Sequence, residues 1–172
     1  KTGATKAGLR GALMALPSSS SGNTSQDINL NVHSAYGAKG DVSVGSVGST
    51  STGVVTITAD GNLIQTNDTD VITGQRINLS STNGTIGQTG KALKVFAGQT
   101  PTATDSLTDS LNATAYGDIN LEQTTGDMRI GTINSSNGDV TLTTSGSIVD
   151  ALPYADKIDR GETDRLIQKW KD

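Results

Sequence analysis

Aliphatic and polar residues alternate along most of the chain, and one triplet with aliphatic first and third positions keeps returning. Alternation with a period of two is typical of β-strands, because successive side chains of a strand point to opposite faces. The first members of the triplets are 16 to 27 residues apart, which is the length of one coil of a β-solenoid rather than of a hairpin repeat. The triplets are Ile28-Asn29-Leu30, Val55-Thr56-Ile57, Ile77-Asn78-Leu79, Leu93-Lys94-Val95, Ile119-Asn120-Leu121 and Val140-Thr141-Leu142.

An internal repeat supports this interpretation. Gly126–Val149 reads GDMRIGTINSSNGDVTLTTSGSIV, and GDVSVGSVGSTSTGVVTITADGNLI at Gly40–Ile64 repeats its glycine and aliphatic positions. A unit that cannot bury its own apolar face gains a core by stacking on its copies. Corners such as Asn83-Gly84 would separate two or three short strands in each coil. Asn-Gly turns also occur in antiparallel hairpins, but the regular return of the triplet favours parallel stacking.

Stacking the coils places the first residues of the triplets in one inward column and the middle residues in one outward row. The predicted fold class is therefore all-β, a right-handed parallel β-helix over residues 25–150, with the hand set by the crossover preference of parallel strands. The expected inward column is Ile28, Val55, Ile77, Leu93, Ile119 and Val140, and the expected outward row is Asn29, Thr56, Asn78, Lys94, Asn120 and Thr141.

Two segments near the start and middle of the chain depart from the alternation. Residues 1–24 are expected to form an N-terminal flank, with a short Ala- and Leu-rich helix over Thr5–Leu16 that ends at Pro17 and a serine-rich linker after it. Gln99–Tyr116 is expected to bulge from one coil as a loop, with Ala113 and Ala115 returning to the sheet.

The last segment, residues 151–172, has dense charges and a helical spacing of apolar residues. It is expected to form one or two short helices that cap an end of the solenoid or connect to a further block. Leu166, Ile167 and Trp170 would form the stripe that packs on it. Such a cap would cover strand edges that otherwise invite association.

The composition fits a thin aliphatic core better than a conventional one. Hydrophobic residues make up 33% and aromatic residues 3% of the chain, while a charged fraction of 17% and a net charge of −4 are too low for a typical disordered chain. The acidic balance argues against nucleic acid as a partner. The absence of cysteine excludes disulfides and thiolate metal sites. No apolar run approaches the roughly 18 residues of a membrane span.

The residues that could carry chemistry are few. His33 is the only histidine, and it has no second histidine or obvious acidic partner nearby in the sequence. The corner aspartates could cap turns or could pair across coils as in β-helical polysaccharide-degrading enzymes; they are Asp60, Asp68, Asp70, Asp118 and Asp127. Asn67–Asp70 gathers oxygens suited to calcium, but a solvated turn explains it equally. No catalytic residue, cofactor or metal site is therefore assigned.

Three sequence runs resemble a known family. They are GDVTLTTSGSIVDA at Gly138–Ala151, GDINLEQTTGDMRIGTI at Gly117–Ile133 and INLSSTNGTIG at Ile77–Gly87. They are similar to the repeats of filamentous-haemagglutinin-like large exoproteins, especially leukotoxin-type filamentous adhesins. The resemblance implies a long right-handed parallel β-helix, export by a two-partner route, and a role in adherence and biofilm formation. It supplies no catalytic residues, and it implies an internal fragment of a longer protein.

Taken together, these patterns predict a non-catalytic structural or adhesive segment of a large bacterial adhesin that is secreted or displayed on the cell surface. Its expected partners are host or neighbouring cell surfaces, glycans or matrix polysaccharide. The alternatives are a carbohydrate- or ice-binding solenoid and, less favoured, a β-helical polysaccharide-degrading enzyme. The Thr-x-Thr pairs at Thr56–Thr58 and Thr141–Thr143 suit ice, but Lys94 in the same expected outward row interrupts a threonine lattice.

Overall fold

The structure is a computed structural model that describes residues 7–8, 13–15, 27–33, 40–49, 53–98 and 110–151. These residues form strands, turns and bends with no helix among them, and every pairing between named strands is parallel. The predicted all-β class and the preference for parallel stacking are confirmed. The helix predicted over Thr5–Leu16 is wrong where the structure describes that segment, because Ala7–Gly8 and Leu13–Ala15 are strands that pair with the strands of the next repeat.

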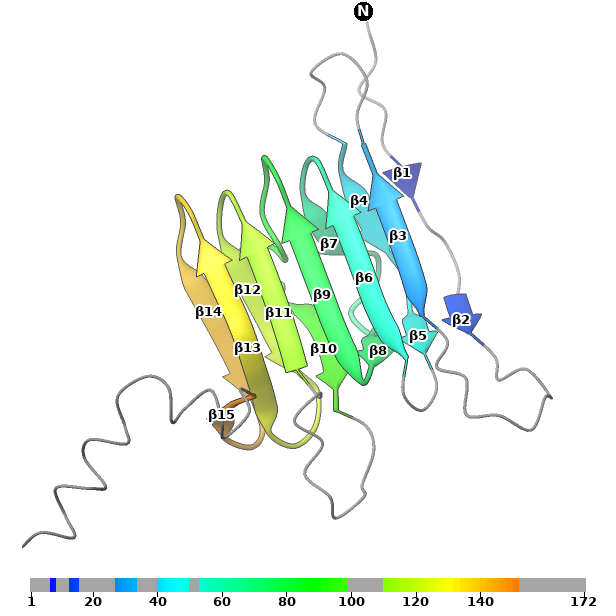
Figure 1. Ribbon diagram of the computed structural model, residues 1–172. Helices are drawn as coiled ribbons and strands as arrows, with labels where there is room; N and C mark the ends of the chain where they lie inside the picture. The colour runs from blue at the N-terminus through cyan, green and yellow to red at the C-terminus, as the bar shows by residue number, and fades with distance from the viewer. Residues whose placement is uncertain are drawn as a thin grey trace, which may run out of the picture.

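Two six-stranded sheets and one three-stranded sheet make up the fold (Figure 1). We call the first the front sheet, after its position in Figure 1; its order is β3 (Ile28–Val32), β6 (Val54–Ala59), β9 (Arg76–Ser81), β11 (Ser110–Ala115), β13 (Met128–Ser135) and β15 (Ile148–Asp150). The back sheet has the order β2 (Leu13–Ala15), β5 (Val47–Ser49), β8 (Ile72–Gly74), β10 (Leu93–Ala97), β12 (Ile119–Gln123) and β14 (Val140–Thr144). The small sheet contains β1 (Ala7–Gly8), β4 (Val42–Val44) and β7 (Leu63–Gln65).

From β3 onward the chain visits the sheets in a fixed rotation, front, small and back, and later alternates between front and back. Each return to a sheet adds a strand beside the previous one. Isolated parallel bridges from Leu63 to Ile86 and from Ile86 to Ile119 continue the small sheet's line of pairing into β12. Segments about one coil apart in sequence therefore lie side by side, as the return of the triplet predicts.

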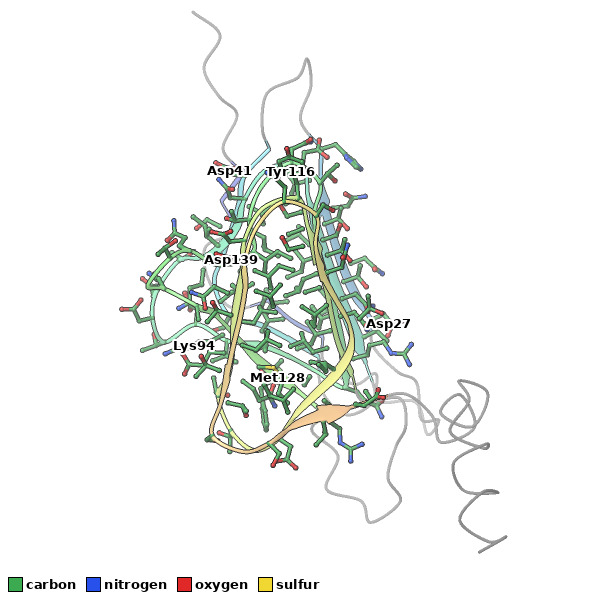
Figure 2. The ribbon with its side chains drawn as sticks, turned by 90° about the vertical axis from the view of Figure 1, so that its left-hand side faces the viewer. Asp27, Asp41, Lys94, Tyr116, Met128 and Asp139 are labelled. Atoms are coloured by element: carbon green, nitrogen blue, oxygen red, sulfur yellow. The ribbon has the colours of Figure 1, made fainter. Side chains whose placement is uncertain are left out.

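The core lies between the facing sheets, where Figure 2, which looks along the stack, shows side chains of the two walls meeting in the interior. Burial alternates strictly along β6 and β9, so that Val55, Ile57, Ile77 and Leu79 are buried and the residues between them are not. Burying each such aliphatic side chain contributes roughly 1.5–3 kcal/mol. A core of Ile, Val and Leu can therefore stabilise the stack without large aromatic residues.

The single inward column predicted from the triplets is wrong. The pairing of Ile28 with Val55 and of Val55 with Ile77 places the first three triplets in the front sheet, whereas the other three begin β10, β12 and β14 of the back sheet. The step from Ile77 to Leu93 spans only 16 residues. It brings the chain across to the opposite sheet instead of back to the same one.

The loop predicted over Gln99–Tyr116 is wrong for residues 110–115. They form β11, which pairs in register with β9 so that Leu111 lies beside Ile77. Leu111 is fully buried, and Ala113 and Ala115 return to the core as predicted. Residues 99–109 lie outside the described part of the chain, as do the predicted linker and the predicted helices after Ala151.

Candidate functional site

The corner aspartates Asp118 and Asp127 hold neighbouring repeats together. A carboxylate oxygen of Asp118 accepts a hydrogen bond from the backbone N–H of Asp139 at 2.9 Å, and that of Asp127 accepts one from Ser147 at 2.8 Å. Each accepting residue lies one repeat before its donor, and Asp41 makes the same bond to the N–H of Asn62 at 2.7 Å. Because a backbone N–H in a turn needs an acceptor, these carboxylates have a structural role at the corners.

His33 and Asp60 meet in space although they are 27 residues apart. The His33 Nδ1 atom lies 3.2 Å from a carboxylate oxygen of Asp60, and the histidine side chain is 68% exposed. No sequence pattern indicates this partner, since it lies in the next repeat. In the described ranges no group of three or more His, Cys, Asp or Glu side chains is placed to hold a metal ion.

The Asp70 carboxylate accepts hydrogen bonds from within the turn Asn67–Asp70 and from Ser46 of the preceding repeat. One carboxylate oxygen of Asp70 accepts hydrogen bonds from the backbone N–H and the side-chain amide of Asn67, at 2.8 and 3.0 Å. The other oxygen accepts a bond from the Ser46 hydroxyl at 3.2 Å. This turn is therefore held by internal hydrogen bonds of the kind expected for an Asx turn.

Asp68, a residue of the same turn, forms an ion pair with Lys91, with 2.9 Å between Nζ and Oδ1. The hydrogen bond and the positive charge of Lys91 lower the pKa of the Asp68 carboxyl below its usual value, and Lys94 adds a smaller effect in the same direction. Lys94 also donates from Nζ to the backbone carbonyl of Asp68 at 2.9 Å. The pair is exposed, so its contribution to stability is small.

These charged side chains line a shallow cavity of about 310 Å³ on the outer surface of the back sheet. Gln65 forms part of its wall, and its amide oxygen accepts a bond from the Lys94 backbone N–H at 2.9 Å. Glu122, the lateral neighbour of Lys94 across β10 and β12, adds a second carboxylate. Positive and negative groups therefore compensate one another here, and the cavity does not select for one sign of ligand.

The outward surface of the front sheet differs in kind, because it carries two rows of short uncharged polar side chains. We call these residues the Asn/Thr face. The first row is Asn29, Thr56, Asn78 and Asn112, and the second is Asn31, Thr58, Ser80, Thr114 and Asn134. Neighbouring strands lie about 4.8 Å apart and alternate residues along a strand roughly 6.6 Å apart, so the rows form a regular lattice.

The two rows differ in their hydrogen bonding. In the first row the amide of Asn112 donates to the Asn78 carbonyl oxygen at 3.0 Å, and the amide of Asn78 donates to the Thr56 hydroxyl at 3.4 Å. The Asn112 carbonyl oxygen also accepts the backbone N–H of Thr132 at 2.9 Å, where the register between β11 and β13 shifts. Within the described part of the chain, the side chains of the second row make no hydrogen bond.

This face is not evident in the sequence for two reasons. The triplet pattern places Lys94 and Asn120 in the same outward row as Asn78, whereas the structure assigns them to the back sheet. Asn112 also lies in the segment that was predicted to be a loop. The signal that could have found β11 is the triplet Leu111-Asn112-Ala113, which has the same apolar, polar, apolar order as the others.

No protein-family model, curated protein or solved structure matches this chain. Across the residues that the structure describes, no helix is long and apolar enough to cross a membrane.

Proposed function

We propose that this chain is a non-catalytic segment of a large bacterial adhesin, secreted or displayed on the cell surface, in which the parallel sheets close into a right-handed β-helix. The hand follows from the strong preference of parallel crossover connections. The family resemblance of the Gly117–Ile133 and Gly138–Ala151 runs supports the assignment by analogy. The segment would act in attachment and biofilm formation, with cell surfaces, glycans or matrix polysaccharide as partners.

The observation that carries this proposal is that four of the five corner aspartates, which a reaction could have used, are held in structural contacts. Asp118, Asp127 and Asp70 accept backbone hydrogen bonds at corners and turns, and Asp68 is paired with Lys91. A hydrolytic site needs an acid and a base converging on one substrate position. An extended polar surface supports instead many weak contacts whose strength comes from their number.

A binding assay on cells and on a glycan array tests the proposal. The intact chain should bind, and it should leave polysaccharides uncleaved over a long incubation. Release of reducing ends from any polysaccharide would refute the non-catalytic role, and failure to bind cells, matrix or glycans would refute the adhesive role.

A deletion that spares the sheet tests whether the segment between β10 and β11 contributes to binding. Because Leu111 is fully buried against the core, the deletion should stop before Ser110. A variant lacking residues 101–108 should keep the strand content of the intact chain by circular dichroism. If that variant loses binding, the segment is the receptor site; if it binds normally, the sheet surfaces are.

A carbohydrate-binding solenoid is the second candidate function, and the Asn/Thr face favours it. With Lys94 assigned to the back sheet, the two rows contain only amide and hydroxyl side chains. Such groups both donate and accept hydrogen bonds.

A further inference from the structure

We infer that the Asn/Thr face is a docking surface for a neutral, ribbon-like polysaccharide such as a β-1,4-linked glucan, with Tyr116 as an aromatic contact at its rim. The inference rests on the proposed binding role and names the class of partner. It begins from the composition of the nine positions, none of which carries a charge.

The absence of charge on these positions points to an uncharged partner. A polyanion such as alginate would gain from basic side chains, and a polycation from acidic ones. The back sheet offers the contrast within the same fold, since Lys94 and Glu122 are lateral neighbours on its outward surface. A neutral polymer loses nothing by leaving charged surfaces in water and matches these two rows best; the strands of the front sheet also carry Arg76 and Arg129, outside the nine positions.

The spacing of the rows suits a repeating ligand. The rows run across the strands, so hydrogen-bonding groups recur about every 4.8 Å, over four adjacent strands in the first row and five in the second. A β-1,4-linked glucan chain is flat and extended, and it repeats its hydroxyl groups at a comparable interval. A rigid, regular array loses little conformational entropy when it binds a repeating partner.

The hydrogen bonding of the two rows assigns them different roles. The bonds among Thr56, Asn78 and Asn112 fix the amides of Asn78 and Asn112 and make this part of the first row a rigid support. In the second row Thr58, Ser80 and Thr114 have hydroxyls that bond to no other side chain or backbone group of the described residues. These hydroxyls are free to exchange water for sugar hydroxyls.

Tyr116 provides an independent observation that points to a sugar. It follows β11 directly, and exposure alternates from Thr114 to Ala115 to Tyr116, so the ring lies on the same side as Thr114. Tyr116 is 52% exposed and lies at the top of Figure 2, at the corner where the chain leaves β11 for the back sheet. An exposed aromatic ring with a polar tip is suited to contact a partner that is apolar on one face and wet at its edges, which describes a pyranose ring.

Ice is the other repeating surface that a flat lattice can match, and the chemistry of the rows disfavours it. Asparagine occupies three of the four first-row positions and both ends of the second row. An amide donates and accepts in a plane and does not reproduce the single hydroxyl and methyl of a threonine lattice. The repeating partner is therefore the polysaccharide, and an ice assay becomes one outcome of the test.

The test measures co-sedimentation of the full chain with microcrystalline cellulose and with chitin, beside soluble alginate. We expect binding to the neutral polymers. Thr114→Lys should weaken it about tenfold or more, because binding would then desolvate the ammonium group and the threonine hydroxyl would no longer bond to the sugar. Thr141→Lys is the matched control: it makes the same change at an exposed threonine on the back sheet and should stay within about twofold of the wild type.

Tyr116→Ala should also weaken binding, and Tyr116→Phe should retain most of it, because stacking needs the ring and not the hydroxyl. Circular dichroism melting confirms that each variant keeps the fold. Equal losses for Thr114→Lys and Thr141→Lys would overturn the assignment to the front sheet. Preferential binding to alginate, or thermal hysteresis in an ice assay, would overturn the class of partner. Cell attachment without binding to cellulose or chitin would overturn this inference and leave the proposed adhesive function standing.

Discussion

The middle of the stack and its C-terminal end are built from the same sequence pattern but are buried to different extents. In β12, Ile119 and Leu121 are fully buried, with β10 on one side and β14 on the other. The aligned Val140 in β14 is 44% exposed, and Ile148 in β15 is 48% exposed. In the described part of the chain nothing pairs with the outer edges of β14 and β15. Burial in this fold is therefore decided by the presence of the next repeat, and not by the residue alone.

The largest difference in stability loss between the two regions is expected when an isoleucine is replaced by alanine in each. Ile77 is fully buried between Val55 and Leu111 of the adjacent strands. Ile77→Ala should lower the free energy of unfolding by about 2–5 kcal/mol, because it removes buried methyl groups and leaves a cavity. Urea unfolding followed by circular dichroism measures this loss. A loss below about 1 kcal/mol would contradict the burial of Ile77 between Val55 and Leu111.

Replacing a close-packed corner glycine should give the next largest loss of stability. A Cβ at Gly84 would lie 2.5 Å from the Gly61 carbonyl carbon and 2.6 Å from the Asn62 backbone nitrogen. Gly84→Ala should therefore cost about 1–3 kcal/mol by overpacking. Gly48→Ala is the control, because its nearest contact is an ordinary 3.8 Å to Thr73. If the two variants unfold at the same urea concentration, the corners are not close-packed.

The same replacement of isoleucine by alanine should change the free energy of unfolding little when it is made at the C-terminal end. Ile148→Ala removes the same atoms from a side chain that is 48% exposed, so we expect a loss of at most about 1 kcal/mol, most of it from strand propensity. The same urea titration measures it. If Ile148→Ala is as destabilising as Ile77→Ala, this end is covered by chain or by a partner, and the comparison fails.

The smallest effect is expected at the exposed pair of Asp68 and Lys91. Because the hydrogen bond and the charge of Lys91 lower the pKa of Asp68 below its ordinary value, the pair contributes stability above that ordinary pKa and loses it as the pH falls through the lowered pKa. Lys91→Met should raise the pKa of Asp68 towards its ordinary value, and Lys94→Met should raise it less. NMR titration of the Asp68 carboxyl carbon measures both shifts. An unchanged pKa in Lys91→Met would show that the ion pair does not form in solution.

The alternation of aliphatic residues predicts the class of fold, and the regular return of the triplet predicts the parallel stacking. Val55-Thr56-Ile57 and Ile77-Asn78-Leu79 are strands with the predicted faces inward. Periodicity along a strand says which face is buried, but not which sheet the strand joins. For that reason the prediction assigns Leu93-Lys94-Val95 to the wrong column. The strand at Ser110–Ala115 escapes prediction because alanine at two inward positions weakens its pattern.

The Asn/Thr face and the His33–Asp60 contact are harder to predict from the sequence, because their residues come from different repeats. The bond from Asn112 to Asn78 spans 34 residues, and the contact between His33 and Asp60 spans 27. The sequence offers each residue alone, and only the register between β9 and β11 makes neighbours of Asn78 and Asn112. The uncharged character of the two rows of the Asn/Thr face becomes visible only when Lys94 is assigned to the back sheet.

Amide hydrogen exchange along the intact chain tests the central comparison most directly, since it reports local opening residue by residue. We predict the strongest protection in β6, β9 and β12, which have hydrogen-bonded neighbours on both sides, and a marked fall in β14 and β15 at the end of the stack. Protection in β14 and β15 equal to that in β9, or weak protection throughout β6, β9 and β12, would contradict it.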